Sequence, residues 1–85
     1  MASGNAKRSL MLAIEEIAQD ERKLIIITDE SRMRARMLED AAKELESSRL
    51  KRLATRLKDE AESADRLRLR LAGIRKDVED VMQVF

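Results

Sequence analysis

The sequence predicts an all-α fold, a long antiparallel hairpin of two helices packed as a coiled coil. Apolar or small residues recur at alternating steps of three and four along most of the chain, and this repeat slips once near its midpoint. No proline interrupts either half. The composition, 41% charged and 44% hydrophobic with Phe85 as the one aromatic residue, is typical of such helices.

The first helix is expected over residues 6–46, after a polar leader at residues 1–5 whose terminal position favours fraying. Its stripe of apolar and small residues is interrupted by one charged residue, Glu21. The stripe consists of Leu10, Ile14, Ile17, Leu24, Thr28, Ser31, Ala35, Leu38, Ala42 and Leu45. A period of 3.5 residues predicts left-handed packing against another helix.

The repeat slips between Leu45 and Leu50, because that step fits neither helical spacing. We therefore expect a turn at residues 47–48, with Ser47 or Ser48 capping a second helix over residues 48–84. The second stripe consists of Leu50, Leu53, Leu57, Glu60, Ala64, Leu67, Leu71, Ile74, Val78, Val81 and Phe85. Reversal at the turn brings the two stripes together in one domain over residues 6–85.

An alternative interpretation divides the first helix near Thr28 and gives a three-helix bundle. The segment Thr28-Asp29-Glu30-Ser31 resembles a helix start, since a hydroxyl that can cap is followed by two acidic residues. The continuous helix is favoured because the heptad phase passes through positions 28 and 31 without a slip.

Two positions of the stripes carry carboxylates, Glu21 and Glu60. The expected register places Glu60 opposite Ala35, and it brings Arg75 and Arg56 close enough to pair with the two carboxylates. Such residues either specify the register of a coiled coil or extend to the edge of a narrow seam.

Apolar residues beside the stripes are concentrated at the open end of the hairpin, away from the turn. An apolar surface of this kind marks association, so we expect two hairpins to form a homodimeric four-helix bundle. The candidate interface residues are Met11, Ala18, Ile25, Ile27, Met82 and Val84.

Several function classes lack the residues they need. The chain has no histidine, cysteine, tyrosine or tryptophan, and it contains no glycine-rich phosphate loop. We therefore expect no enzyme activity, no catalytic residue, no cofactor and no metal site. The longest aliphatic run, Leu24 to Ile27, is too short to cross a membrane, and the lack of cysteine fits a reducing compartment, so we expect a cytoplasmic protein.

The net charge of +1 conceals an uneven distribution, because the basic residues are concentrated in the second helix. Arginine suits bidentate contacts with phosphate, so these residues are candidate nucleic-acid contacts. The candidates are Arg49, Lys51, Arg52, Arg56, Arg66 and Arg70. The acidic residues between them favour a second interpretation, an ordinary solvated face of helix ion pairs.

These observations favour a non-enzymatic protein-interaction module, an oligomerisation, adaptor or chaperone-like hairpin. Its expected partners are a second copy of itself and an unidentified protein, with no membrane involved. The alternative is a small nucleic-acid-binding regulator that uses an arginine-rich helix face.

Overall fold

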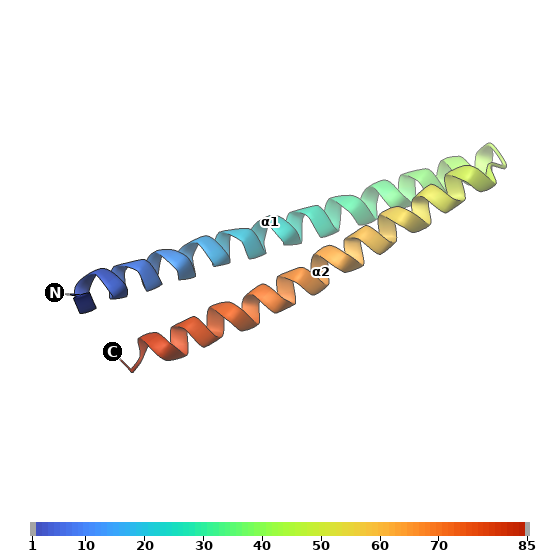
Figure 1. The fold of residues 1–85 in the computed structure, drawn as a ribbon. Helices are drawn as coiled ribbons and strands as arrows, with labels where there is room; N and C mark the ends of the chain where they lie inside the picture. Colours follow the sequence, from blue (N-terminus) through green and yellow to red (C-terminus); the bar gives the residue numbers. More distant parts are fainter. Residues whose placement is uncertain (1, 85) are drawn as a thin grey trace.

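The computed structural model describes the backbone of residues 2–84 and the side chains of residues 4–84. It consists of two helices, α1 (Ala2–Glu44) and α2 (Ser48–Met82), packed antiparallel in a hairpin of 66 × 14 × 13 Å (Figure 1). The all-α hairpin predicted from the sequence is confirmed. The three-helix alternative is wrong, because α1 continues past Thr28 without a break. Neither α1 nor α2 has a stretch long and apolar enough to cross a membrane.

The helix bounds differ from the expected ones at three ends. Residues 2–5, expected as a leader, belong to α1, since no proline prevents the helix from extending there. The first helix ends at Glu44 rather than at residue 46, because Glu46 leaves the helical conformation. The second helix ends at Met82 rather than at residue 84. Phe85, the last position of the expected stripe, lies outside the described residues.

The chain reverses through a Schellman turn between the two helices. Glu46 adopts a left-handed conformation with φ of 49°, and its N–H donates to the carbonyl of Lys43 at 3.4 Å. The Ser47 N–H donates to the carbonyl of Ala42 at 3.0 Å. The Ser47 hydroxyl then accepts from the N–H of Leu50 at 3.2 Å, so Ser47 is the N-cap of α2, as one of the two predicted caps.

The left-handed Glu46 makes the turn a site where glycine is expected to stabilise the protein. This conformation costs a non-glycine residue about 1 kcal/mol, and glycine avoids that cost. Glycine also has greater conformational freedom in the unfolded chain, which offsets part of the gain in stability. We expect Glu46→Gly to raise the free energy of unfolding by about 0.5 kcal/mol, measured by chemical denaturation. Ser48→Gly, at the first residue of α2, is the control and should not stabilise the protein. A Glu46→Gly variant less stable than the wild type would argue against this turn.

Burial along α1 follows the predicted stripe. Ten of its positions, spaced alternately by three and four residues, are half-buried or buried: Leu10, Ile14, Ile17, Glu21, Leu24, Thr28, Ser31, Ala35, Leu38 and Ala42. Leu45, the last predicted position, is exposed because it lies in the turn. The buried Thr28 hydroxyl donates a hydrogen bond to the carbonyl of Leu24 at 2.8 Å. Its hydrogen-bonding capacity is therefore used within α1, and it does not cap a new helix.

Only half of the positions in the predicted stripe of α2 face α1. The positions spaced by seven residues from Leu50 to Val78 face α1 as expected, but the positions between them lie one residue further along. Facing α1 are Ala54, Ala61, Arg68, Arg75 and Met82, in place of the exposed Leu53, Glu60, Leu67, Ile74 and Val81. The expectation that Glu60 faces Ala35, within reach of Arg56, is therefore wrong.

Two physical effects account for this rotation of α2. Glu60 in the seam would lose its hydration, whereas the rotated helix leaves its carboxylate in water. The rotation also places alanine against alanine near the turn, where Ala35 and Ala61 are both 0% exposed. Small side chains let helix axes approach closely. In Figure 1 the two ribbons overlap near the turn and are seen side by side toward the termini, where larger side chains fill the seam.

Candidate interaction surfaces

The rotation of α2 leaves a second apolar stripe outside the seam. Its members remain partly exposed to solvent, with exposed fractions from 38% at Leu53 to 51% at Ile74. They recur every seven residues along α2, except that Glu60 occupies one position. Ile27 of α1 lies on the same side of the seam. We call this surface the leucine flank and define it by Ile27, Leu53, Leu67, Ile74 and Val81.

The other side of the seam is dominated by charges. Lys58 Nζ lies 2.6 Å from the carboxylate of Glu39, and Arg32 and Asp65 line one groove between the helices. We call this surface the charged flank and define it by Arg32, Glu39, Lys51, Lys58, Asp65 and Glu79. The leucine flank is interrupted only by Asp20, Arg34 and Glu60, so it is the more apolar of the two.

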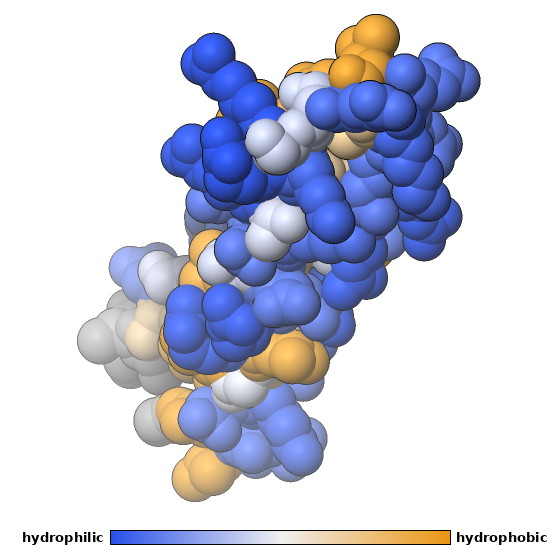
Figure 2. Space-filling view, turned by 90° about the vertical axis from the view of Figure 1, so that its right-hand side faces the viewer, coloured by the Kyte–Doolittle hydropathy of each residue, from blue (hydrophilic) through white to orange (hydrophobic). Residues whose placement is uncertain are grey.

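The candidate interface residues predicted from the sequence are divided by this geometry. Met11, Ala18 and Ile25 lie on the charged flank, toward the open end, whereas Ile27 lies on the leucine flank. Met82 is half-buried in the seam, and Val84 follows the end of α2 and is exposed. Viewed from the turn, the surface is largely hydrophilic, with apolar patches near the top and toward the termini (Figure 2).

A charged cluster crosses the seam where the sequence placed Glu21. Arg75 donates two hydrogen bonds to the Glu21 carboxylate, at 2.5 and 3.2 Å, and a third to Glu79 at 2.8 Å. The predicted pairing of Arg75 with Glu21 is confirmed. The hydrogen bond from Arg75 holds the pKa of the 12% exposed Glu21 carboxyl below its ordinary value, and the pKa of Arg75 is raised in return. Two-pronged contacts of this kind favour one register of α1 against α2.

A pH dependence of stability follows from this cluster and from the Glu39–Lys58 pair. A hydrogen bond from Lys58 lowers the pKa of Glu39, as Arg75 lowers that of Glu21, both from an unfolded value near 4.5. Depressed pKa values stabilise the folded state above pH 4.5, and this contribution is lost as the pH falls through the folded values. The wild type should therefore lose thermal stability below pH 4.5 more steeply than a Glu21→Gln/Glu39→Gln variant.

Thermal denaturation followed by circular dichroism across the acid range checks this prediction. The control is Glu15→Gln/Glu16→Gln, which removes two exposed carboxylates of α1 and should keep the acid dependence of the wild type. Equal acid slopes in all three proteins would contradict a stabilising role for the two cross-helix pairs.

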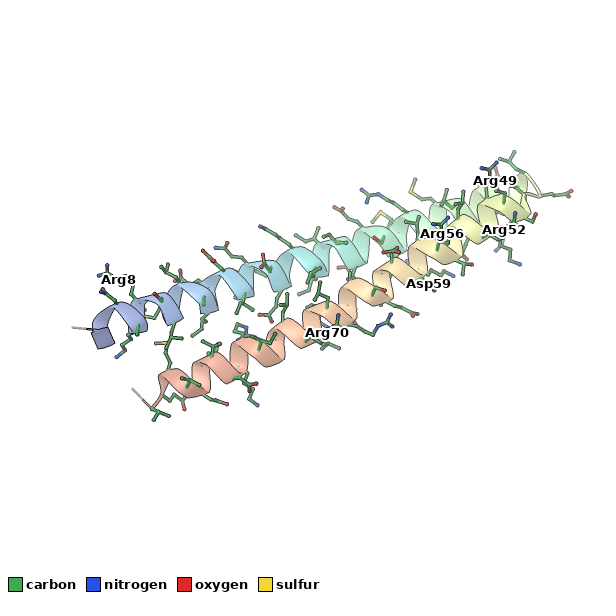
Figure 3. The ribbon with its side chains drawn as sticks, viewed as in Figure 1. Arg8, Arg49, Arg52, Arg56, Asp59 and Arg70 are labelled. Atoms are coloured by element: carbon green, nitrogen blue, oxygen red, sulfur yellow. The ribbon has the colours of Figure 1, made fainter. Side chains whose placement is uncertain are left out.

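The six predicted nucleic-acid contacts are all exposed, but they do not share one surface. Lys51 belongs to the charged flank. The five arginines are spaced by three, four, ten and four residues, and they occupy the face of α2 that points away from α1. Figure 3 shows Arg49, Arg52 and Arg56 near the turn and Arg70 about midway along α2, with Asp59 between them.

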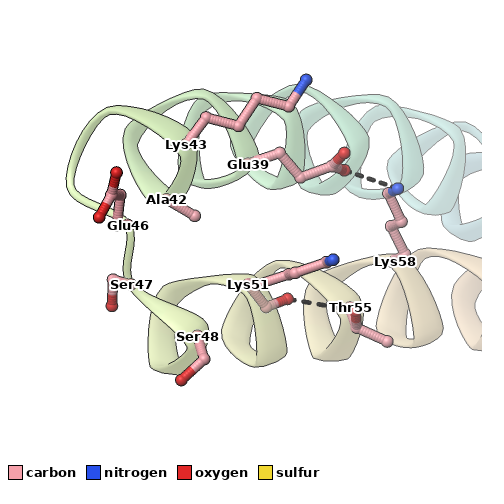
Figure 4. Close-up of a pocket in the computed structure, with 9 residues that line it drawn as sticks. All are labelled: Glu39, Ala42, Lys43, Glu46, Ser47, Ser48, Lys51, Thr55 and Lys58. Atoms are coloured by element: carbon pink, nitrogen blue, oxygen red, sulfur yellow. Dashed lines mark hydrogen bonds and ion pairs between the residues drawn. The ribbon is translucent and has the colours of Figure 1, made fainter.

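A shallow groove of about 300 Å³ lies on the charged flank beside the turn (Figure 4). The Glu39–Lys58 ion pair spans it between the helices. Its lining consists of Glu39, Ala42, Lys43, Glu46, Ser47, Ser48, Lys51, Thr55 and Lys58. Three lysines and two glutamates are among these residues, so the groove presents little net charge. Among the residues that the structure describes, no group of three or more acidic side chains is placed to hold a metal ion.

Comparison of the chain with protein-family models, with curated proteins and with solved structures finds no match. The assignment of a function therefore depends on the two flanks and the outer face of α2. Sequence reasoning missed the leucine flank as a surface, although its seven-residue spacing is visible in the sequence as half of the expected stripe.

Proposed function

We propose that this chain is a self-associating protein-interaction module in which two hairpins pack along their leucine flanks into a four-helix bundle. The observation that carries the proposal is the second apolar stripe, which faces solvent in a hairpin whose seam is already occupied. An apolar stripe with heptad spacing is suited to packing against another long helix. Of the roles that the sequence leaves open, this favours oligomerisation over adaptor or chaperone-like binding.

The length of the stripe indicates a long helical partner. From Leu53 to Val81 it extends along nearly all of α2, or about 42 Å at the rise of an α-helix. A second hairpin supplies two helices of matching length and the same stripe, so that one surface meets its own copy. Contact between identical surfaces is the usual form of a twofold dimer.

The area exposed by one hairpin supports a dimer of ordinary size. A single chain has an accessible surface of 6817 Å², whereas a compact monomer of 9.8 kDa exposes about 5,200 Å². Burying this excess on both copies gives an interface of roughly 3,200 Å² in total, within the range of obligate homodimers. The hairpin alone keeps no large side chain of residues 4–84 fully buried.

Two of the three charges on the leucine flank are compatible with an antiparallel arrangement of two copies. Asp20 and Arg34 lie at equal sequence distances on either side of Ile27. A twofold axis at the level of Ile27 therefore places Arg34 of each copy at the level of Asp20 of the other. Opposite charges at such positions favour one alignment over a shifted one.

Multi-angle light scattering of the wild type at rising concentration tests the proposal. We expect twice the chain mass of 9.8 kDa, with the monomer appearing only on dilution, because an interface of this size associates tightly. Thermal unfolding should also shift to higher temperature as the concentration rises. A folded species of one chain mass at every concentration would refute the proposal.

A further inference from the structure

The rotation of α2 sorts its arginines into two sets with different surroundings. Arg68 and Arg75 turn toward the seam, where Arg68 pairs with Asp65 at 2.9 Å and Arg75 pairs with Glu21 and Glu79. The second set points away from α1, and we call it the arginine stripe. It consists of Arg49, Arg52, Arg56, Arg66 and Arg70.

The arginine stripe is one continuous helix face. Steps of three and four residues keep side chains on one side of a helix, and Asp59 and Ser63 fill the two positions of this face between Arg56 and Arg66. From Arg49 to Arg70 the stripe is about 32 Å long at the rise of an α-helix. Every member is exposed, and Figure 3 shows labelled members distributed along α2.

Most of this positive charge is not neutralised within the hairpin. Arg66 is held by Glu62 at 3.9 Å and by the Ser63 hydroxyl at 3.3 Å. No carboxylate of the described residues forms an ion pair with Arg49, Arg52, Arg56 or Arg70. The outer face of α1 differs, because its basic residues alternate with acidic ones.

We propose that the arginine stripe binds the phosphate backbone of double-stranded nucleic acid without reading its sequence. Guanidinium groups form two-pronged hydrogen bonds with phosphate, and a row of them on a straight helix complements a regular row of negative charges. The 32 Å length is close to one turn of duplex DNA, about 34 Å.

The chemistry of the chain favours a duplex over a single strand. Proteins that hold single strands stack the bases on aromatic side chains, and this sequence has one aromatic residue, Phe85. A duplex keeps its bases stacked on each other and offers only phosphates and groove edges. The stripe lies on neither flank, so the inference goes beyond the proposed dimer and stands independently of it.

A salt titration of binding to a duplex DNA of random sequence tests the proposal. Five phosphate contacts predict a slope of about −4.5 in log affinity against log salt, or a loss of about 500-fold between 50 and 200 mM salt. The variant Arg52→Gln/Arg56→Gln/Arg70→Gln should reduce the slope by about 2.7. Its matched control is Arg22→Gln/Lys23→Gln/Arg36→Gln, which removes the same charge from exposed positions of α1 and should retain the wild-type slope.

A single-residue substitution provides an independent check that does not weaken folding. Asp59→Asn removes the one acidic residue that lies on this helix face between Arg49 and Arg70. It should increase duplex affinity several-fold, whereas the control Asp29→Asn on α1 should not. Equal effects of the α1 and α2 variants would mean general charge attraction and would overturn the proposal. So would tighter binding to single strands, binding to heparin or an acidic peptide without duplex binding, or no binding. Light scattering on the same samples reports the dimer separately.

Discussion

The proposed dimer predicts that the variant Leu67→Asp/Ile74→Asp is a monomer at concentrations where the wild type associates. Both residues lie near the middle of the leucine flank, so each new carboxylate would be buried against the second copy without a partner. A buried, unpaired charge costs about 3 kcal/mol or more, so the dissociation constant should rise by a factor of at least about 100. Light scattering measures the mass, and thermal denaturation should show a lower midpoint, because dimerisation no longer stabilises the fold.

A matched control separates the flank from apolar exposure in general. Leu69 lies between the two substituted residues and is 56% exposed, but it points away from both flanks. Leu69→Asp should therefore leave the mass of the wild type unchanged. Ile25→Asp and Ile27→Asp compare the two flanks directly, and only Ile27→Asp should weaken the dimer. If Leu69→Asp dissociates the protein as strongly as the double variant, the leucine flank is not the interface.

Replacing Ala61 by leucine is expected to destabilise the hairpin itself. Ala61 is completely covered by α1, and the register set by the Glu21–Arg75 and Glu39–Lys58 pairs places it at the level of the equally covered Ala35. A larger side chain forces the helices apart where they approach closely. Overpacking of this kind costs about 1–3 kcal/mol, which chemical denaturation would measure as a lower midpoint with an unchanged slope.

Ser63→Leu is the control for this second prediction, because it adds a leucine at an exposed position two residues away. It should change the free energy of unfolding by less than about 0.5 kcal/mol. An Ala61→Leu variant as stable as this control would show that the helices are not closely packed at that level, and that α2 presents a different face to α1.

The hairpin could be predicted from the sequence because local signals and the long-range pattern agree. The slip in the repeat, the absence of proline and the capping Ser47 all indicate one reversal near the midpoint. The stripe of α1 was predictable because its steps of three and four residues continue without a slip from Leu10 to Ala42. The partnership of Glu21 and Arg75 followed from the register.

The face of α2 could not be chosen from α2 alone. Two stripes lie side by side on this helix, one with Leu53 and Glu60 and the other with Ala54 and Ala61. Ranking the positions by the size of their apolar side chains predicts that the leucines face α1. In the structure the alanines face α1 instead, because their small size matches that of Ala35 across the seam. A usable signal was the seven-residue spacing of small residues on both helices at the same level. This spacing predicts which face of α2 packs on α1 only when the two helices are considered together.

The candidate surfaces were harder to predict for a related reason. A heptad stripe has two sides, and the sequence pattern treats them alike until the second helix is oriented. The predicted interface therefore combined Ile25 and Ile27, which lie on opposite flanks. The arginines needed the same information, because Arg66 and Arg68 lie only two residues apart in a basic segment, yet Arg66 points to solvent and Arg68 to the seam.

Thiol labelling of two single-cysteine variants tests the leucine-flank dimer most directly, since the chain has no cysteine of its own. Within one hairpin, Leu67 and Leu69 are both exposed, so Leu67→Cys and Leu69→Cys would react at similar rates if the protein were monomeric. Association along the leucine flank predicts that Leu67→Cys reacts much more slowly and that its protection increases with protein concentration. Equal rates for the two variants at every concentration would contradict it.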